Sequence, residues 1–217
     1  MSSSGRWAEE TARIIVESRS LYARAHGEPF FYSSGWASPL YIDCKKLISS
    51  PADRNTLVEM MIEKLSDSLD LDALEVVAGC ELSGIPFATL VADRLSKPLV
   101  LVRRQSKGFG RLAHFEGEFE PGAKVLLIDD LATDGMSEAV FLNALEQAEA
   151  DVMETFALID FDVFPTAYSH VSLAKLRDIV DCARKDQYFG LPTLEEVEKF
   201  IEDPAHWSRQ HGGIAGL

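Results

Sequence analysis

Hydrophobic positions along the chain predict short buried strands that alternate with amphipathic helices. Apolar residues recur every three or four positions from Trp7 to Tyr22 and again over residues 52–69, which is the spacing of one helix face. Continuously aliphatic runs follow, separated by further helical segments, as is typical of a parallel sheet with both faces covered. We expect these strands at residues 74–79, 98–103, 124–129, 155–160 and 178–182. The pattern therefore predicts the α/β class.

Turn and cap residues set the expected limits of the other elements. Residues 26–51 are rich in Gly, Pro, Ser and aromatic side chains, which predicts irregular chain with short strands. Helices are expected to begin at Pro86, at Ser137 as an N-cap and at Thr193 in a capping box, and Pro204 should end or kink the last one. The sequence shows no repeat and no low-complexity linker. We therefore expect a single domain.

Composition narrows the possible function classes. The 217 residues carry a formal charge of -14, from 35 acidic against 21 basic side chains, so the chain should repel nucleic-acid phosphates and anionic lipid. No stretch approaches the roughly 18 apolar residues of a membrane span, and the N-terminus lacks a signal-peptide pattern. Three separated cysteines without C-x-x-C spacing, and five scattered histidines, argue against disulfides and transition-metal sites. These features predict a soluble cytoplasmic protein that binds neither nucleic acid nor membrane.

An acid pair followed by a loop of small residues forms the strongest candidate site, in the segment VLLIDDLATDGMS (125–137). Asp129 and Asp130 end an aliphatic strand, and the loop after them leads into a helix, with Gly135 allowing close backbone approach. Ligands of parallel sheets lie at this end of the strands, and amide groups at a helix N-terminus bind phosphate. Carboxylates suit hydroxyl groups and hard cations. The combination predicts a sugar phosphate site; the alternative is a pair of surface acids, with Asp134 in a turn.

This segment resembles the phosphoribosyl diphosphate signature of the type I phosphoribosyltransferases, and it matches neither a P-loop nor a dinucleotide-binding turn. The resemblance implies the fold of that family, a central parallel sheet flanked by helices with a small hood subdomain. It also implies that Asp129 and Asp130 contact the ribose hydroxyls of 5-phosphoribosyl 1-diphosphate. The residues implied to bind its 5-phosphate are Leu131, Ala132, Thr133, Asp134, Gly135, Met136 and Ser137.

Three more segments, in the same order along the chain, resemble those of orotate phosphoribosyltransferases. FFYSSGWASPLYID (30–43) is similar to part of their hood, and VAGCELSGIPFAT (77–89) to their diphosphate loop. Residues 102–130 resemble their mobile catalytic loop and the strand after it. The substrate contacts that this implies outside the signature are Tyr41 and Ile42 near the base and Leu82 and Ser83 at the diphosphate, while Thr133 of the signature also reaches the base.

The segment that resembles the mobile loop is rich in basic residues. Four of them fall within nine positions of an acidic chain, and Gly108 and Gly110 supply flexibility. Such a loop can close over a departing diphosphate, stabilise its growing charge and exclude water; the alternative is a solvated hairpin. We expect catalysis to depend chiefly on Lys107. The other expected catalytic residues are Arg104, Asp129 and Asp130, and the basic residues of the loop are Arg103, Arg104, Lys107 and Arg111, of which the first three are expected to bind substrate.

The resemblance also implies a reaction and its partners. Ribose 5-phosphate would pass from 5-phosphoribosyl 1-diphosphate to orotate, giving orotidine 5-phosphate and diphosphate in de novo pyrimidine (UMP) synthesis. Mg²⁺ would bridge diphosphate and ribose oxygens, with no protein side chain expected as a direct ligand. The family implies a homodimer whose mobile loop is shared between subunits. Within a single domain of residues 1–217, the hood would come mainly from about residues 1–50, with the C-terminal helix as a further candidate, and the core from about residues 51–185.

Four positions depart from the common orotate phosphoribosyltransferase pattern. Ser33 and Ser83 stand where many members have lysine, Phe109 where histidine is common, and Phe161 where an arginine meets the orotate carboxylate. Two alternatives therefore stay open. One is a phosphoribosyltransferase for a purine or another base. The other is a non-catalytic sensor of phosphoribosyl nucleotides, against which the retention of Lys107 argues.

Overall fold

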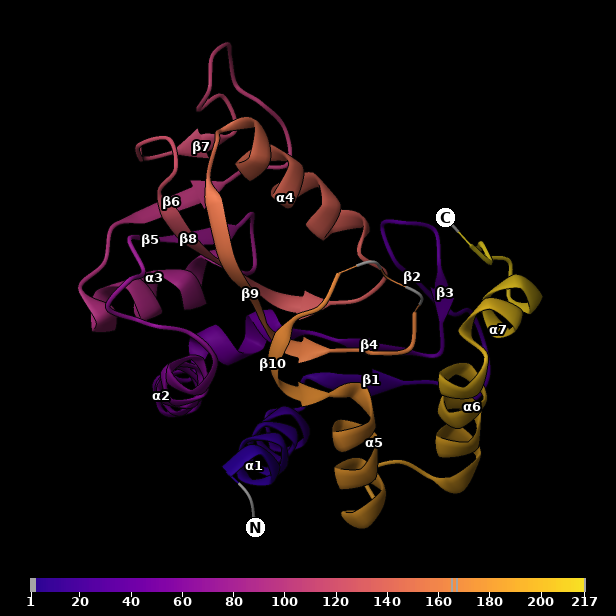
Figure 1. The fold of residues 1–217 in the computed structure, drawn as a ribbon. Coiled ribbons are helices and arrows are strands. Elements are labelled where there is room, and N and C mark those ends of the chain that lie inside the picture. Colours follow the sequence, from indigo (N-terminus) through magenta and orange to yellow (C-terminus); the bar gives the residue numbers. More distant parts are fainter. Residues whose placement is uncertain (1–2, 165, 167, 217) are drawn as a thin grey trace. The chain divides into compact units, whose positions relative to one another are not determined.

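Four neighbouring parallel strands form the middle of a six-stranded sheet in the computed structural model (Figure 1). The strand order is β10-β9-β8-β5-β6-β7, and the short β7 runs antiparallel to β6 at one edge. In chain order the strands are β5 (Val76–Cys80), β6 (Leu99–Val102), β7 (Phe115–Glu116), β8 (Lys124–Ala132), β9 (Asp151–Asp160) and β10 (Val171–Lys175). Aliphatic runs without alternation predicted these central strands, because a strand covered on both faces has no solvent side.

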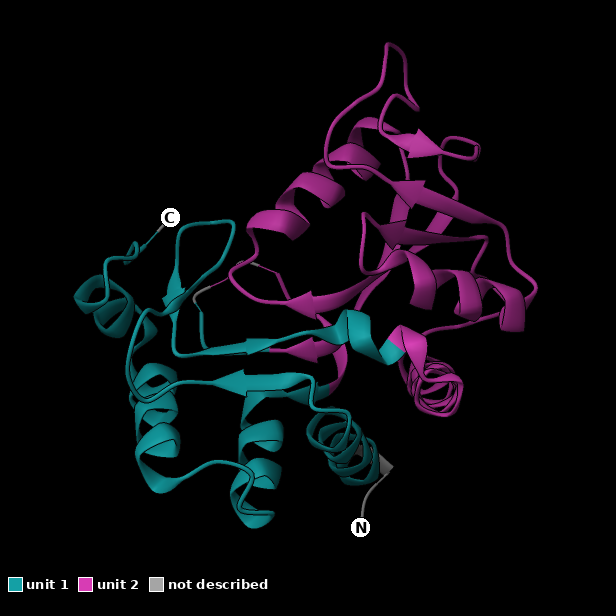
Figure 2. Cartoon of the chain, turned by 180° about the vertical axis from the view of Figure 1, so that it is seen from behind, with its two compact units in different colours: residues 1–47, 161–165, 174–217 teal, residues 48–160, 166–173 magenta. Residues whose placement is uncertain are grey.

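The structure describes residues 3–164, 166 and 168–216, which group into two compact units (Figure 2). Unit 1 combines residues 1–47, 161–165 and 174–217. Unit 2 combines residues 48–160 and 166–173 and holds most of the sheet. The chain therefore leaves unit 2 directly after β9 and again within β10.

Helices cover both faces of the sheet in unit 2. Phe141 and Leu145 of α4 join a hydrophobic core with side chains of β5, β6 and β8, among them Cys80. Side chains alternate along a strand, so the neighbouring Gly79 faces the other way, where a Cβ would lie 2.8 Å from that of Ala88 in α3. The helices of this unit are α2 (Pro51–Ser68), α3 (Ile85–Leu95) and α4 (Met136–Gln147). This arrangement confirms the predicted α/β class.

Aromatic side chains hold unit 1 together. Trp36 packs on Phe164 with ring centroids 4.8 Å apart, Phe164 on Phe200 at 5.8 Å, and Phe200 on Trp207 at 5.7 Å. Two short antiparallel pairs, β1 with β4 and β2 with β3, lie in the same unit. Its elements, with the 3-10 helix η1 that leads out of it, are α1 (Ser3–Glu17), β1 (Leu21–Ala23), β2 (Phe30–Phe31), β3 (Ala37–Ser38), β4 (Leu40–Ile42), η1 (Cys44–Ser49), α5 (Leu176–Lys185), α6 (Leu191–Glu202) and α7 (Pro204–Gln210).

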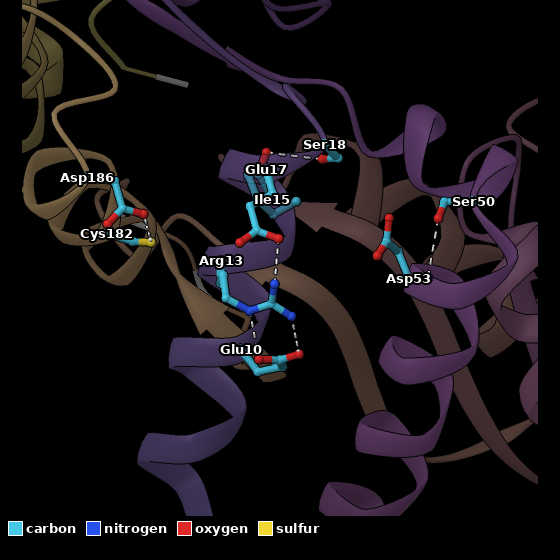
Figure 3. A network of polar contacts seen from close by, with 9 residues as sticks. All are labelled: Glu10, Arg13, Ile15, Glu17, Ser18, Ser50, Asp53, Cys182 and Asp186. Atoms are coloured by element: carbon cyan, nitrogen blue, oxygen red, sulfur yellow. Dashed lines mark hydrogen bonds and ion pairs between the residues drawn. The ribbon is translucent and has the colours of Figure 1, made fainter.

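Local polar contacts stabilise individual helices (Figure 3). On the solvent face of α1, Arg13 lies 2.6 Å from a carboxylate oxygen of Glu10 and also pairs with Glu17. Exposed pairs of this kind contribute only about 0.3–0.5 kcal/mol each. At the start of α2, the Ser50 hydroxyl accepts the Asp53 N–H at 3.4 Å, which is an N-cap. None of the described helices is long and apolar enough to cross a membrane.

The N-terminal helix was predicted correctly except for its end, and the last strand was predicted incorrectly. α1 ends at Glu17, and Tyr22 lies in β1, because Arg19 takes a left-handed backbone conformation (φ 56°) that an α-helix does not continue. The strand expected at residues 178–182 is instead part of α5, and β10 directly precedes it. The buried side chains of α5 have helical spacing: Leu176, Ile179, Val180 and Ala183.

Two helices begin earlier than predicted. The N-cap of α4 is Gly135, not Ser137. α6 begins at Leu191 rather than at Thr193, because the proline at its second position suits the first turn of a helix. Pro204 opens α7 after α6 has ended, as expected for a residue that stops a helix.

Candidate active site

The acid pair lies near the end of β8, in unit 2. Asp129 is opposite Ala157 of β9, and the strand continues through Ala132, beyond the predicted end. Both carboxylates are half-buried, and Asp129 Oδ1 accepts the N–H of Asp130 at 2.9 Å. Burial, and then the negative charge of Asp130, raise the pKa of Asp129 well above the usual range. The pair is therefore held in a partly desolvated setting, which is unusual for ordinary surface acids.

The turn after the acid pair is fixed by a buried side chain. Asp134 is only 5% exposed, and its Oδ1 accepts the Met136 N–H at 3.1 Å, which turns the chain into α4 before Ser137 is reached. Its Oδ2 is buried without a hydrogen-bond partner among the described residues. Gly135 has φ 81°, and a Cβ there would lie 2.7 Å from the Thr166 hydroxyl. Only glycine fits this turn, and the free amide groups of the first helical turn follow it.

A cavity lies beside this turn, and all of its lining residues belong to unit 2. The space beside the turn is about 390 Å³, a figure that includes open solvent and is not an enclosed volume. Six of the predicted site residues line it: Asp129, Leu131, Ala132, Thr133, Gly135 and Ser137. The cavity thus combines an acid, a glycine turn and a helix N-terminus, which is the combination that the sequence predicted for a sugar phosphate.

The predicted catalytic loop reaches the same helix start. Arg104 donates from Nη2 to the Ser137 hydroxyl at 2.6 Å. Lys107 Nζ and Arg103 Nη1 both lie on one carboxylate oxygen of Glu116, at 3.1 and 3.0 Å. The hydrogen bond from Lys107, followed by that from Arg103, lowers the pKa of Glu116. Lys107 remains 63% exposed, so its ammonium group lies at the surface of the loop.

Arg111 has a different environment from the other basic residues of the loop. It donates from Nη1 to the Ala148 carbonyl at 2.8 Å and from Nη2 to the Phe119 carbonyl, and its guanidinium lies over the Phe119 ring. This residue anchors the loop. No atom lies within 4 Å of a Cβ placed on Gly108 or Gly110, so the tip between Lys107 and Arg111 is open.

The predicted diphosphate loop packs directly against the acid pair. A Cβ on Gly84 would lie 2.4 Å from the Ile128 carbonyl oxygen and 2.9 Å from the Asp129 Cα. Glu81 accepts the Arg104 N–H at 2.9 Å, which ties this loop to the catalytic loop. Leu82 is exposed and Ser83 half-buried, and neither lines the cavity. The close approach at Gly84 was not recognised in the sequence, although G-I-P before a helix was.

The residues expected near the base lie in unit 1. The Tyr41 ring in β4 is 5.9 Å from that of Phe30 and 6.4 Å from that of Tyr22. The neighbouring Ile42 is buried. Phe161, at the position where the family often has arginine, is 1% exposed and packs edge-on against a tyrosine ring of the same unit. Phe161 is therefore a core residue.

Sequence reasoning missed an ion pair in the cavity wall. Glu138, in the first turn of α4, lies with Oε1 2.7 Å from Nδ1 of His170, and both side chains are largely buried. In the sequence the five scattered histidines only argued against a transition-metal site. His170 lies far along the chain from the signature and reaches the cavity only because β10 follows β9 and β8 in the sheet. Cys80 also lines the cavity; burial, then the charges of neighbouring acids, raises the pKa of its thiol, which agrees with a buried, unreactive cysteine.

Comparison with known proteins agrees with this geometry. The model of the phosphoribosyl transferase domain family matches residues 53–163. An orotate phosphoribosyltransferase from Sinorhizobium fredii is 38% identical over 218 residues, covering 97% of this chain and 94% of that protein. The chain belongs to the orotate phosphoribosyltransferase family.

Solved structures of this family share the fold. The orotate phosphoribosyltransferase from Aeropyrum pernix superposes with a TM-score of 0.66 at 26% identity, over 79% of this chain and 97% of that one. UMP synthase from Leishmania donovani gives a TM-score of 0.76 at 24% identity, over 89% of this chain and 42% of that one, which is a likeness of fold alone. The predicted central sheet with flanking helices is thereby confirmed.

Proposed function

We propose that this chain transfers ribose 5-phosphate from 5-phosphoribosyl 1-diphosphate to orotate, releasing diphosphate and forming orotidine 5-phosphate. The observation that carries the proposal is the cavity at the end of β8, where Asp129 of the acid pair meets a glycine turn and a helix N-terminus. Near full-length similarity to orotate phosphoribosyltransferases supports the same reaction. The protein acts as a homodimer in the cytoplasm, with its mobile loop shared between subunits.

The 5-phosphate binds at the start of α4. Amide groups of the turn and of the first helical turn point toward this position, where the helix dipole favours an anion. The Ser137 hydroxyl and the Arg104 guanidinium, already hydrogen-bonded to each other, add donors beside it. The segment that makes these contacts is Leu131, Ala132, Thr133, Asp134, Gly135, Met136 and Ser137, with Asp134 fixing the turn.

Asp129 and Asp130 bind the ribose hydroxyls. Two half-buried carboxylates, one directly after the other in the chain, provide acceptors for both hydroxyl protons. The main-chain N–H of Asp130 donates to Asp129 Oδ1 and so fixes the Asp129 carboxylate. Because Gly84 packs on the Asp129 backbone, the diphosphate loop with Leu82 and Ser83 is held beside the acid pair. Both ends of the transferred group are thereby positioned by neighbouring main-chain segments of unit 2.

Lys107 is the catalytic residue for the departing diphosphate, assisted by Arg103 and Arg104. Its bond to Glu116 is an exposed ion pair that solvent screens, so a diphosphate can take its place. The loop tip at Gly108 is unobstructed and can close over the ligand. Positive charge that arrives with closure stabilises the transition state as the negative charge of the leaving group grows.

The residues present suit Mg²⁺ bound mainly through the substrate. Among the described residues, no group of three or more His, Cys, Asp or Glu side chains forms a metal cage. Asp129 and Asp130 would hold the ion only through water, in keeping with the preference of Mg²⁺ for retained waters and phosphate oxygens. When bound, the ion would neutralise charge on the diphosphate.

Base recognition in unit 2 rests on Thr133, which lines the cavity. Phe161 is buried, so no cation at this position meets the carboxylate of orotate. This observation favours one second candidate, transfer of the same ribose 5-phosphate to a purine or another base.

A turnover assay separates these candidates. Purified protein with 5-phosphoribosyl 1-diphosphate and Mg²⁺ should release diphosphate when orotate is added and should not do so with hypoxanthine or xanthine. Release with a purine and none with orotate would replace the proposed base. Binding of ribose 5-phosphate without turnover on any base would indicate a sensor.

A further inference from the structure

A glutamate stands in the wall of a cavity that is suited to an anion. The Glu138 side chain is 13% exposed, and its Oε2 is buried without a hydrogen-bond partner among the described residues. It occupies the first turn of α4, where the amide groups that bind phosphate also lie. An uncompensated carboxylate there would repel a phosphate ester, because charges in a partly desolvated cavity interact strongly.

His170 supplies the compensating group. Its Nδ1 lies 2.7 Å from Glu138 Oε1, and its side chain is 5% exposed. The Thr155 hydroxyl donates to the Ser169 carbonyl at 2.9 Å, so it presents a lone pair to His170 Nδ1 at 3.4 Å. Nδ1 therefore carries a proton and faces two acceptors. Among the described residues that line the cavity, His170 is the only basic side chain.

Acidic groups on neighbouring elements favour the charged imidazole. Burial alone would lower the pKa of His170, but the hydrogen bond and charge of Glu138, together with Asp160 and Glu154 of β9, outweigh it and raise this pKa above the ordinary value. The other titratable groups in the cavity wall are Cys80 of β5 and Asp129 of β8. No second basic residue of the cavity wall shares the compensation with His170.

We propose that His170 is a positioning residue of the ribose 5-phosphate pocket, which cancels the charge of Glu138 and holds its carboxylate away from the phosphate ester. The proposal rests on the proposed function, because it takes the cavity as the site of ribose 5-phosphate. The affinity for phosphate should then depend on the Glu138–His170 pair as well as on the loop and the N-terminus of α4. Affinity should then fall when His170 loses its proton.

Titration calorimetry with ribose 5-phosphate on the full chain tests this proposal. His170→Gln removes the cation and leaves Glu138 charged, so affinity at neutral pH should fall by about tenfold or more. Glu138→Gln removes the carboxylate that needs compensation, and the double variant removes both groups of the pair. Each should bind within about twofold of the unmodified chain, a difference of about 0.4 kcal/mol. Rescue by the second substitution distinguishes charge compensation from damage to the fold.

The pH profile adds a readout that a purely structural role would not change. Ionisation of the ligand is common to all variants, so the double variant serves as the reference. Relative to it, the unmodified chain should lose affinity as the pH rises through the pKa of His170, and His170→Gln should be weak throughout. Glu146→Gln, on the exposed far end of α4, and His206→Gln, an exposed histidine of α7, are matched controls that should bind normally.

Three results overturn the proposal. If the losses from the single substitutions simply add in the double variant, or if the profiles of the unmodified chain and the double variant coincide, the pair does not set the affinity. If the unmodified chain fails to bind ribose 5-phosphate at all, the proposed function fails with it. Retained binding with additive losses leaves the proposed function intact and removes only the role of His170.

Discussion

Replacing Gly84 by alanine tests how closely the diphosphate loop packs on the acid pair. Gly84 has φ -74° and ψ -26°, a conformation that alanine adopts freely. Where space allows, such a substitution stabilises a protein by about 0.4–1 kcal/mol, because the unfolded chain loses freedom. Here the added methyl group would meet the Ile128 carbonyl oxygen at 2.4 Å and the Asp129 Cα at 2.9 Å. Both are main-chain atoms of a central strand, so neither can rotate away.

The clash of the added methyl group should therefore decide whether Gly84→Ala stabilises or destabilises the protein. Overpacking a rigid site costs about 1–3 kcal/mol, which exceeds the conformational gain. For a chain of this size each kcal/mol lowers Tm by roughly 2–4 °C, so Gly84→Ala should melt roughly 2–12 °C lower. Thermal unfolding by calorimetry or circular dichroism measures the shift. Because the strain pushes on the Asp129 backbone, affinity for ribose 5-phosphate should also fall.

Gly108→Ala is the matched control for stability. No atom lies within 4 Å of a Cβ at Gly108, so the free energy of unfolding of this variant should stay within about 0.5 kcal/mol of that of the unmodified chain. An unchanged or raised Tm for Gly84→Ala would show that the loop does not lie against the strand, and the argument from close packing would be refuted.

Three other substitutions or conditions give clear outcomes. Lys107→Ala should lower kcat about a hundredfold or more in steady-state kinetics, while calorimetry should show an unchanged affinity for ribose 5-phosphate. An equal loss of kcat and of this affinity would mean that Lys107 contributes to ground-state binding. Arg111→Met should lower the free energy of unfolding by about 1–3 kcal/mol in urea titrations, because the Ala148 and Phe119 carbonyls lose their donor; an unchanged midpoint would contradict the anchor. The pKa of His170 is raised in the folded protein, so its pair with Glu138 stabilises the fold fully below the pKa that His170 has in the unfolded chain, about 6.5. This stabilisation is lost as the pH rises through the pKa of His170 in the folded protein. Unfolding free energies measured against pH should show this loss in the unmodified chain and not in the double variant Glu138→Gln/His170→Gln.

Local sequence signals predicted the part of the candidate site that is formed by one continuous segment of the chain. Asp129 to Gly135 form one continuous strand end, turn and helix start, and their roles depend on neighbours within a few positions. The exact N-cap was misplaced because the buried Asp134 side chain accepts the Met136 N–H and turns the chain into the helix before Ser137. α5 was predicted as a strand because a short apolar run at residues 178–182 fits either period until its flanking residues are considered.

Contacts that depend on the order of the strands in the sheet could not be predicted from local sequence signals. Glu138 directly follows the signature, but nothing local identifies His170 as its partner, since that pairing needs β10 and β9 to lie beyond β8. Gly84 is a similar case, because its requirement for glycine comes from the Ile128 carbonyl on another strand. Phe161 could be recognised as unusual in the sequence, but its burial in unit 1 appears only in the fold.

The charges around the cavity explain why the loop is so basic. The chain carries -14 overall, and the described wall of the cavity contributes Asp129 and Glu138 against the single basic side chain of His170. The side chains of the wall therefore give an anionic substrate little net electrostatic attraction. Most of the attraction that the wall provides comes from the amide groups at the start of α4. The remaining positive charge must come from outside the wall, and Arg104 already reaches Ser137 from the loop. We therefore expect substrate binding and ordering of the loop to be coupled, since each supplies charge that the other lacks.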